Sequence, residues 1–356
     1  MEFGLFSNGQ RYNDIAKITY AQDLDEVILA DELGFKEAWI SEHGTFVSFH
    51  APDQMPSADL FICKAAALTK NIRLGPGIRP LPFFHPLQVA TDCAVCDHLT
   101  DGRYMAGFGL GLGGAKTEPR GKLPGTPRDM GYEALELILK AWTSPEPFDW
   151  DGRFWQGKQW KIIPKPLTKP HMDVGIACSK SDSTLQLTAK HGFFPLLSWH
   201  QRPDDLARMI TTYLESPADG VKANRNRVRV SRFIYVTESV EQARRELRDC
   251  DVGAAKFNRL NEYIPEGGTR DDLTMEHLMD EGVLFCGDPD TVTQQIRTFY
   301  DELGGFGTLL LVCGKDWGTW EQRQRSWRMF TRDVAPRLAD LDGNTSTHDL
   351  AHNAAK

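Results

Sequence analysis

Short apolar runs alternate with helix-like patterns along almost the whole chain, and this alternation constrains the fold more than any other feature. The apolar runs lie at 3–6, 37–41, 72–78, 103–109, 172–177, 193–198, 228–236 and 307–312. Patterns with helical spacing follow them at 19–33, 57–69, 86–99, 129–142, 181–191, 203–216, 239–249 with 288–303, and 319–336. Strands that alternate with helices of about ten to fifteen residues form parallel βαβ units, and eight such units close naturally into a barrel. We therefore predict an α/β protein built as a single (β/α)8 TIM barrel.

Two stretches are longer than a barrel connection requires. After the fourth strand, residues 144–171 are rich in Pro, Trp and Gly, which predicts an ordered excursion with a short hairpin. In the region of the seventh strand, residues 251–285 carry a Gly-Gly pair and a cluster of charge, and an insertion of this length is a candidate lid. We expect the barrel to span 1–338 and the polar residues 339–356 to form a flexible tail.

The charge balance argues against nucleic-acid binding. Lys and Arg number 41 and Asp and Glu 49, so the net charge of −8 provides no overall basic field. No apolar run reaches the roughly 18 residues of a membrane span, and the first residues lack the pattern of a secretion signal. We therefore expect a cytoplasmic protein that binds neither nucleic acid nor a membrane.

The seven cysteines are odd in number and lie mostly inside apolar runs, which predicts reduced thiols in the core. Cys93 and Cys96 form a CxxC pair, which is also found in redox and zinc sites. Their segment has helical apolar spacing, however, and no second Cys pair lies nearby to complete a metal site. We interpret this pair as structural and predict no metal.

Active sites of such barrels lie at the carboxyl ends of the strands, so the residues just after each apolar run are the candidates. Glu42 and His43 follow the second run, where a carboxylate beside an imidazole can donate or accept a proton. The alternative is a surface histidine without a role. Ser179 to Thr184 follow the fifth run and open a helix, which forms either an anion site or an ordinary helix cap. Ser198 and Trp199 follow the sixth run, and Trp199 is either a stacking surface or part of the core.

Glycines gather after the third and fourth runs. Gly109, Gly111 and Gly114 match the dinucleotide pattern GxGxxG, but that pattern requires a helix to begin within it, and here the chain continues as a loop. We therefore reject a dinucleotide site. These glycines and Gly77 instead predict a backbone that a planar ring or a mobile loop approaches closely.

Taken in order, these segments resemble the bacterial luciferase-like family of flavin-dependent monooxygenases. The resemblance rests on EAWISEHGTF, IRLGPGIRPLPFFHP, DGRYMAGFGLGLG, KPHMDVGIACSKSDSTLQLTAKHGF, FFPLLSW and CGDPDTVTQQI, and it spans about 1–338. It implies a homodimeric enzyme that binds reduced FMN, supplied by a separate reductase, and reacts it with O2 through a C4a-hydroperoxide. One oxygen atom then passes to an apolar or aromatic small molecule. The alternatives are hydride transfer with a deazaflavin or flavin on the same fold, and a barrel lyase or a flavin-binding protein without oxygenase activity.

The resemblance also implies roles for single residues. His43 and Glu42 match the catalytic pair, and Gly77 and Ile78 match a non-prolyl cis peptide beneath the flavin ring. The FMN-binding positions are Gly77, Ile78, Gly109, Arg128, Ser179, Lys180, Ser181, Thr184, Ser198 and Trp199. Among them, Arg128 or Lys180 is expected to supply the phosphate charge, because Gly131 and Tyr132 stand where many members have an arginine. The apolar mouth that keeps water from the reaction is expected to include Phe46, Phe49, Phe83, Phe84 and Trp317.

Overall fold

The computed structural model describes residues 1–7, 16–42, 55–111, 125–248, 260–261, 263–312 and 317–343. The strands of the main sheet are β1 (Glu2–Ser7), β2 (Glu37–Ile40), β3 (Arg73–Pro76), β4 (Arg79–Pro80), β5 (Ala106–Gly109), β8 (Val174–Cys178), β9 (Phe194–Leu197), β10 (Arg229–Val236), β11 (Leu284–Gly287) and β12 (Thr308–Val312). The helices are α1 (Ala16–Glu32), α2 (Ala58–Ala66), α3 (Pro86–Leu99), α4 (Pro127–Thr143), α5 (Asp182–Lys190), α6 (Pro203–Glu215), α7 (Val240–Arg248), α9 (Met275–Asp280), α10 (Pro289–Glu302) and α11 (Trp320–Met329).

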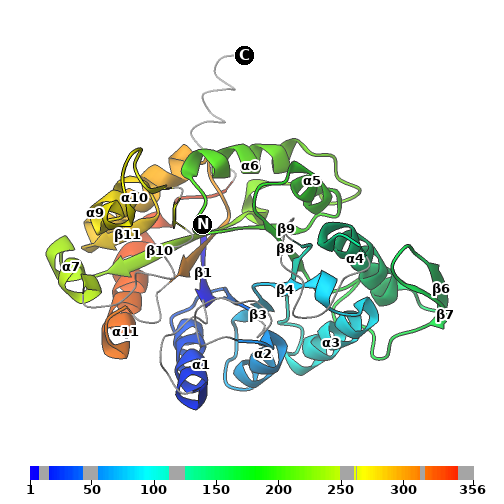
Figure 1. Cartoon of the computed structure of the whole chain (residues 1–356). Coiled ribbons are helices and arrows are strands. Elements are labelled where there is room, and N and C mark those ends of the chain that lie inside the picture. Colours follow the sequence, from blue (N-terminus) through cyan, green and yellow to red (C-terminus); the bar gives the residue numbers. More distant parts are fainter. Residues whose placement is uncertain are drawn as a thin grey trace.

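The strands form one parallel sheet that closes on itself. Its order is β3-β2-β1-β12-β10-β9-β8-β5-β4, with β11 paired to β10. Strand β3 lies within the predicted run 72–78 and β4 directly follows that run. Both lie along β5: β4 pairs with it, and Leu74 of β3 bridges to Tyr104 just before it. The eight predicted runs therefore supply the eight positions of a barrel, and the helices surround it (Figure 1). The predicted (β/α)8 barrel is confirmed.

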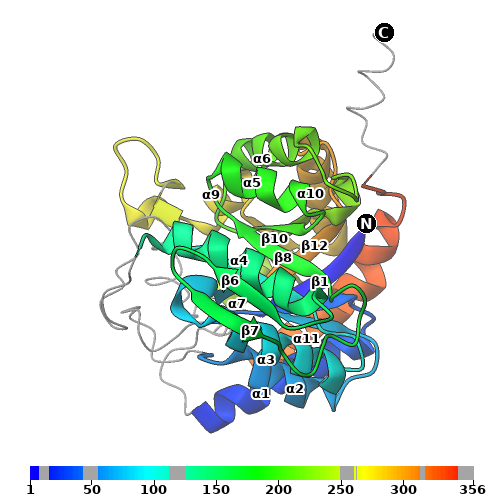
Figure 2. The same cartoon turned by 90° about the vertical axis from the view of Figure 1, so that its right-hand side faces the viewer.

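The excursion after the fourth barrel strand contains the predicted hairpin. Strands β6 (Phe148–Asp151) and β7 (Gln156–Trp160) pair antiparallel outside α4, on the face turned toward the viewer in Figure 2. Glu133 of α4 fixes the turn, because its carboxylate accepts hydrogen bonds from the backbone N–H groups of Phe154 and Trp155.

One strand was missed by the sequence analysis. Strand β11 pairs with the second half of β10, over Phe233–Val236, while the first half of β10 pairs with β12. The stretch predicted as a lid insertion, 251–285, therefore ends inside the sheet. Residues 251–259 and 262 lie outside the described residues, and a lid role for this stretch stays a prediction.

The buried Trp39 fills the centre of the barrel and explains three glycines. A Cβ on Gly107 would lie 1.8 Å from the carbonyl oxygen of Pro76 and 2.9 Å from the Trp39 ring. On Gly75 and Gly175 it would lie 3.0 and 2.7 Å from the same ring. The indole thus occupies the space that side chains on three other strands would need. This packing forms the floor beneath the carboxyl ends of the strands, which we call the barrel mouth.

Five of the seven cysteines lie in the described residues, and they carry free thiols. Four of them are buried, and Cys63 is partly exposed. The described residues contain no group of three or more His, Cys, Asp or Glu side chains that could hold a metal ion. Among the same residues, no helix is long and apolar enough to cross a membrane.

Candidate functional site

Ionisable side chains gather on one side of the barrel mouth, in a cluster that we call the charged corner: Glu42, Asp59, Arg79, Asp92 and Tyr104. Glu42 lies two residues after the end of β2, and Arg79 begins β4. The Arg79 Nη2 atom lies 2.8 Å from Asp59 Oδ2, and its Nε atom lies 3.7 Å from Glu42 Oε2. Its Nη1 atom donates a 3.4 Å hydrogen bond to Asp92 Oδ2. One guanidinium therefore joins the ends of two barrel strands to α2 and α3.

The charges of this corner are buried. Glu42, Asp59 and Arg79 are each less than a tenth exposed, whereas the Asp92 side chain is 39% exposed. Burial lowers the pKa of Arg79, but the charges of Asp59 and Glu42 outweigh it and raise that pKa above its usual value. Burial raises the pKa of Asp59, against the opposing effects of Arg79 and of the Tyr104 hydroxyl. That hydroxyl donates a 2.7 Å hydrogen bond to Asp59 Oδ1.

The peptide bond between Gly77 and Ile78 is cis, as the resemblance implies. The Gly77 N–H donates to the carbonyl oxygen of Ile40, which ties this bond to the end of β2. A Cβ on Gly109 would lie 2.3 Å from Ile78 Cδ1. The described neighbour that requires glycine at position 109 is therefore the Ile78 side chain, rather than a mobile loop.

Hydroxyl groups and one arginine meet at the N-terminus of α5, in a group that we call the Ser181 cluster: Arg128, Tyr132, Ser181, Ser183 and Thr184. Arg128 lies in the first turn of α4, and its Nη1 atom donates a 3.3 Å hydrogen bond to Ser181 Oγ. Ser181 Oγ lies 2.8 Å from Ser183 Oγ. The Tyr132 hydroxyl lies 3.1 Å from Ser183 Oγ. Ser181 is the N-cap residue of α5, but its side chain makes no capping hydrogen bond.

This arrangement suits an anion. Backbone N–H groups at a helix N-terminus and the helix dipole both favour negative charge, and Arg128 adds a full positive charge beside them. The structure places Arg128 against the predicted loop. Lys180 is exposed, and the carbonyl oxygen of Ser179 accepts a 2.5 Å hydrogen bond from Gln201.

Four buried rings form a row across the other side of the mouth, which we call the aromatic row: Trp199, Phe233, Trp317 and Tyr235. The ring centroids of Trp199 and Phe233 are 4.7 Å apart, and those of Phe233 and Trp317 are 5.0 Å apart. The Tyr235 ring meets Trp317 edge-on at 6.1 Å. Each ring is at most 4% exposed, so the row is a continuous buried apolar layer built from β10 and from the segments after β9 and β12.

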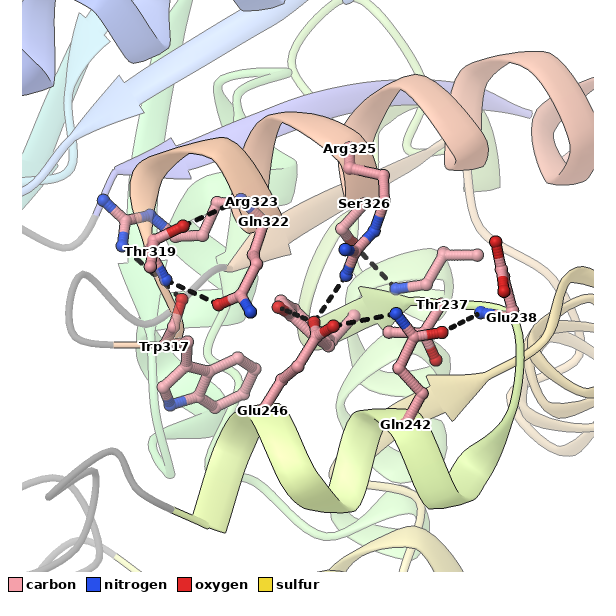
Figure 3. Close-up of polar contacts among 12 residues, drawn as sticks. Thr237, Glu238, Gln242, Glu246, Trp317, Thr319, Gln322, Arg323, Arg325 and Ser326 are labelled. Carbon is pink, nitrogen blue, oxygen red and sulfur yellow. Dashed lines mark hydrogen bonds and ion pairs between the residues drawn. The ribbon is translucent and has the colours of Figure 1, made fainter.

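Polar side chains from α7 and α11 form hydrogen bonds with residues of the aromatic row. The Tyr235 hydroxyl donates a 2.7 Å hydrogen bond to Glu246 of α7. Glu246 also receives hydrogen bonds from Gln242 at 2.8 Å and from Arg325 of α11 at 2.5 Å (Figure 3). Burial raises the pKa of Glu246, but these hydrogen bonds outweigh it and hold the pKa below its usual value. Arg323 donates to the carbonyl oxygen of Trp317 at 3.5 Å, as Figure 3 also shows.

A second arginine, Arg232 of β10, fixes the loop that carries Trp199. Its guanidinium is fully buried and donates to the carbonyl oxygens of Trp199 at 3.2 Å, Gln201 at 2.8 Å and Gly282 at 2.7 Å. Burial lowers its pKa to about 10. Five hydrogen bonds to neutral carbonyl groups thus stand in place of the carboxylate partner that a buried arginine usually has.

Known proteins with similar sequences identify the family. The model of the luciferase-like monooxygenase family matches residues 1–305. The chain belongs to this family. It is 30% identical over 351 residues to 4-hydroxyprotoasukamycin monooxygenase of Streptomyces nodosus subsp. asukaensis, across 94% of this chain and 91% of that protein. It is 26% identical to 3,6-diketocamphane 1,6-monooxygenase of Pseudomonas putida, across 95% of this chain and 98% of that protein.

A solved structure confirms the fold. It is the oxygenating constituent of 3,6-diketocamphane monooxygenase from Pseudomonas putida, a type II Baeyer–Villiger monooxygenase in complex with FMN. The TM-score is 0.80 at 24% identity, over 94% of this chain and 98% of that one. This luciferase-like monooxygenase is thus an enzyme of the oxygenase class with the expected barrel.

The residues predicted for the site of this luciferase-like monooxygenase fall into three groups. Glu42, the cis peptide, the Ser181 cluster and Trp199 with Trp317 lie where strand ends meet. Phe84 packs against the charged corner, with its ring centroid 5.2 Å from Arg79 Cζ, and Phe83 ends a short 3-10 helix beside it. His43, Phe46 and Phe49 lie outside the described residues. The sequence analysis missed Arg79, Arg232 and Glu246.

Proposed function

We propose that the protein is a two-component monooxygenase that uses reduced FMN and O2 to oxygenate an apolar or aromatic small molecule. The observation that carries this proposal is the contact between Arg128 and Ser181 at the N-terminus of α5. It joins a fixed cation, hydroxyl groups and a helix N-terminus, which together match a terminal phosphate.

The residues present fit FMN. The Ser181 cluster would hold its phosphate, and the Ile78 side chain and Trp199 would contact its ring system. When bound, reduced FMN supplies the electrons that activate O2 and let one oxygen atom pass to the substrate.

The protein's own part is to orient, to exclude water and to control protons. A phosphate held by Arg128 and Ser181 fixes which ring face meets the substrate. The buried rings of the aromatic row offer an apolar surface that keeps water away and binds an apolar substrate. Glu42 brings a carboxylate to the mouth, and we propose that His43, the next residue in the chain, acts with it in holding or delivering a proton.

We also propose that a separate reductase supplies the reduced FMN. The diketocamphane relative is named as an oxygenating constituent, which indicates that its electrons come from another protein.

The test is an anaerobic titration with reduced FMN, followed by mixing with air and a ketone or an aromatic compound. We expect binding of reduced FMN that is tighter than binding of reduced riboflavin, and an oxygenated product after air enters. Turnover with a reduced deazaflavin in the absence of O2 would instead establish hydride transfer. No product with any acceptor and no preference for FMN over riboflavin would contradict the proposal.

A further inference from the structure

We propose that Arg79 is a positioning residue that holds the Glu42 carboxylate ionised and fixed at the barrel mouth. This inference deepens the proposed function and rests on it, because it assigns the residue through which Glu42 is prepared for proton control. It concerns a residue whose contacts no sequence pattern indicated.

The first argument is the charge of the corner. Glu42 and Asp59 bring two carboxylates into a buried region, and an ionised carboxylate away from water costs several kcal/mol unless a cation or hydrogen bonds compensate it. Arg79 lies within ion-pair distance of both. The nearby Tyr104 hydroxyl and Cys93 thiol are neutral, since burial raises the pKa of each. The Phe84 ring packs against the guanidinium and adds no charge.

The second argument is that the guanidinium is held independently of Glu42. Asp59 lies 2.8 Å from one terminal nitrogen, and Asp92 accepts a hydrogen bond from the other. Tyr104 in turn fixes the second oxygen of Asp59. Arg79 is therefore positioned by α2, α3 and the segment before β5, and its Nε side faces Glu42 from a fixed place. The direction of influence runs from Arg79 to Glu42.

The third argument is location. Arg79 directly follows Ile78, the second residue of the cis peptide, and its guanidinium reaches Glu42, two residues after β2. Glu42 also accepts a 3.3 Å hydrogen bond from the N–H of Ala58, the first residue of α2. One side chain thus relates the position of the Glu42 carboxylate to that of the Gly77–Ile78 bond. Movement of either strand end changes the distance between them.

The consequence concerns protons. An ionised Glu42 accepts hydrogen bonds and stabilises a protonated partner, whereas a neutral Glu42 would itself donate a proton. We expect loss of Arg79 to make Glu42 take up a proton, and oxygenation then to fail with release of hydrogen peroxide in place of product.

The test compares the variant Asp59→Asn with the double variant Asp59→Asn/Arg79→Met. The Asp59→Asn change removes the second buried carboxyl group, so that a protonated carboxyl band in this corner reports Glu42. It also means that the loss of Arg79 leaves no unpaired charge at position 59, so the double variant is expected to fold. Infrared spectra at neutral pH report the protonated carboxyl band. We expect a new band in the double variant that disappears when Glu42→Gln is added. Absence of that band, with the fold intact by circular dichroism, would overturn the inference without any measurement of activity.

The second measurement is the fraction of reduced FMN that yields oxygenated product. We expect the double variant Asp59→Asn/Arg79→Met to lower this fraction about tenfold or more relative to Asp59→Asn, because proton control by a positioned group is worth at least that much. FMN affinity should change little, since Arg128 lies in another cluster. Arg79→Lys should restore part of the product, since it keeps the charge.

The matched control is Arg73→Met. Arg73 opens β3 of the same barrel strand and pairs with Asp173, but both side chains are about a third or more exposed at the opposite end of the strand. This variant should keep the product fraction of the wild type. If Arg73→Met lowers it relative to the wild type as much as the double variant lowers it relative to Asp59→Asn, Arg79 has only a structural role. If the wild type itself makes no product, the proposed function fails, and the infrared comparison still decides the role of Arg79.

Discussion

The charged corner and the aromatic row lie at the same barrel mouth, but they place their charges differently. In the corner, Glu42 and Arg79 themselves stand at the strand ends, and ion pairs connect them. In the row, the four rings pack against one another, and the charged residues Glu246 and Arg325 lie beyond the hydroxyl of Tyr235, on α7 and α11. The corner is therefore suited to control a proton, and the row is suited to define an apolar space. On the proposed function, the buried charges of the corner take part in proton control, whereas those beside the row support its rings.

Removal of Arg232, which fixes the loop carrying Trp199, should have the largest effect on stability. Arg232→Met regains some of the cost of burying a charge, but it leaves several buried carbonyl oxygens without a donor, at about 1–3 kcal/mol each. We expect the loss to prevail and the free energy of unfolding to fall by about 4 kcal/mol, measured by urea denaturation. The control is Arg202→Met. Arg202 follows the same loop and pairs with Glu281, but its side chain is 41% exposed, so its loss should cost under about 1 kcal/mol. Equal losses would mean that Arg232 has no special role.

Trp317 tests whether the row shapes a substrate site. Trp317→Ala removes a buried ring between Phe233 and Tyr235, and we expect a loss of about 3 kcal/mol in the free energy of unfolding. Trp317→Phe keeps a ring in the row and should cost less. In steady-state kinetics, we expect Trp317→Phe to raise KM for the apolar substrate while the affinity for FMN stays within about twofold. A change in FMN affinity larger than the change in KM would place the ring at the flavin instead.

The fold could be predicted because its information is local. Apolar runs of four to nine residues and helical spacing recur with a fixed order, and a barrel is the simplest closure of eight such pairs. Strand β11 was missed because it lies at the end of a long segment with a cluster of charge, which we interpreted as one insertion. It is defined by its partner β10, which is about fifty residues away along the chain.

The site could be predicted only in part, and for a related reason. Glu42, Ser181 and Trp199 lie two or three residues after strands, where position alone suggests a role. Arg232 lies inside an apolar run and Arg79 directly follows one, but in neither case does the sequence indicate the partner of the guanidinium. Their partners, such as Asp59 and the carbonyl group of Gly282, come close only when the barrel closes. Glu246 likewise faces Tyr235 and Arg325 because α7 and α11 pack beside β10.

Arg128 differs from the arginines of the charged corner and the aromatic row because it is partly exposed. We expect Arg128→Ala to weaken FMN binding about tenfold, because a hydrogen bond to a charged group contributes about 1.5 kcal/mol or more. Riboflavin, which lacks the phosphate, serves as the matched ligand and should bind the two proteins equally. Because Arg128 is partly exposed, the difference for FMN should shrink as salt concentration rises. Equal weakening of FMN and riboflavin would show that Arg128 supports the fold of the mouth rather than the phosphate.

The smallest expected effect is on the pH dependence of stability. The contributions of Glu246 and Asp59 to the free energy of unfolding should change with pH in opposite directions. The folded-state pKa of Glu246 lies below its usual 4.5, so its ionised form stabilises the protein above that pH, and this contribution is lost as pH falls through the lowered pKa. The pKa of Asp59 lies above its usual 3.8, so its contribution is present below that pH and is lost as pH rises through the raised pKa. Urea unfolding between about pH 3 and about pH 7 compares each carboxylate with its neutral variant. The excess stability of the wild type over Glu246→Gln should grow with pH, whereas its excess over Asp59→Asn should shrink. Slopes of the same sign would mean that Arg79 compensates Asp59 as fully as Tyr235 and Arg325 compensate Glu246, and the contrast between the corner and the row would then lie in geometry alone.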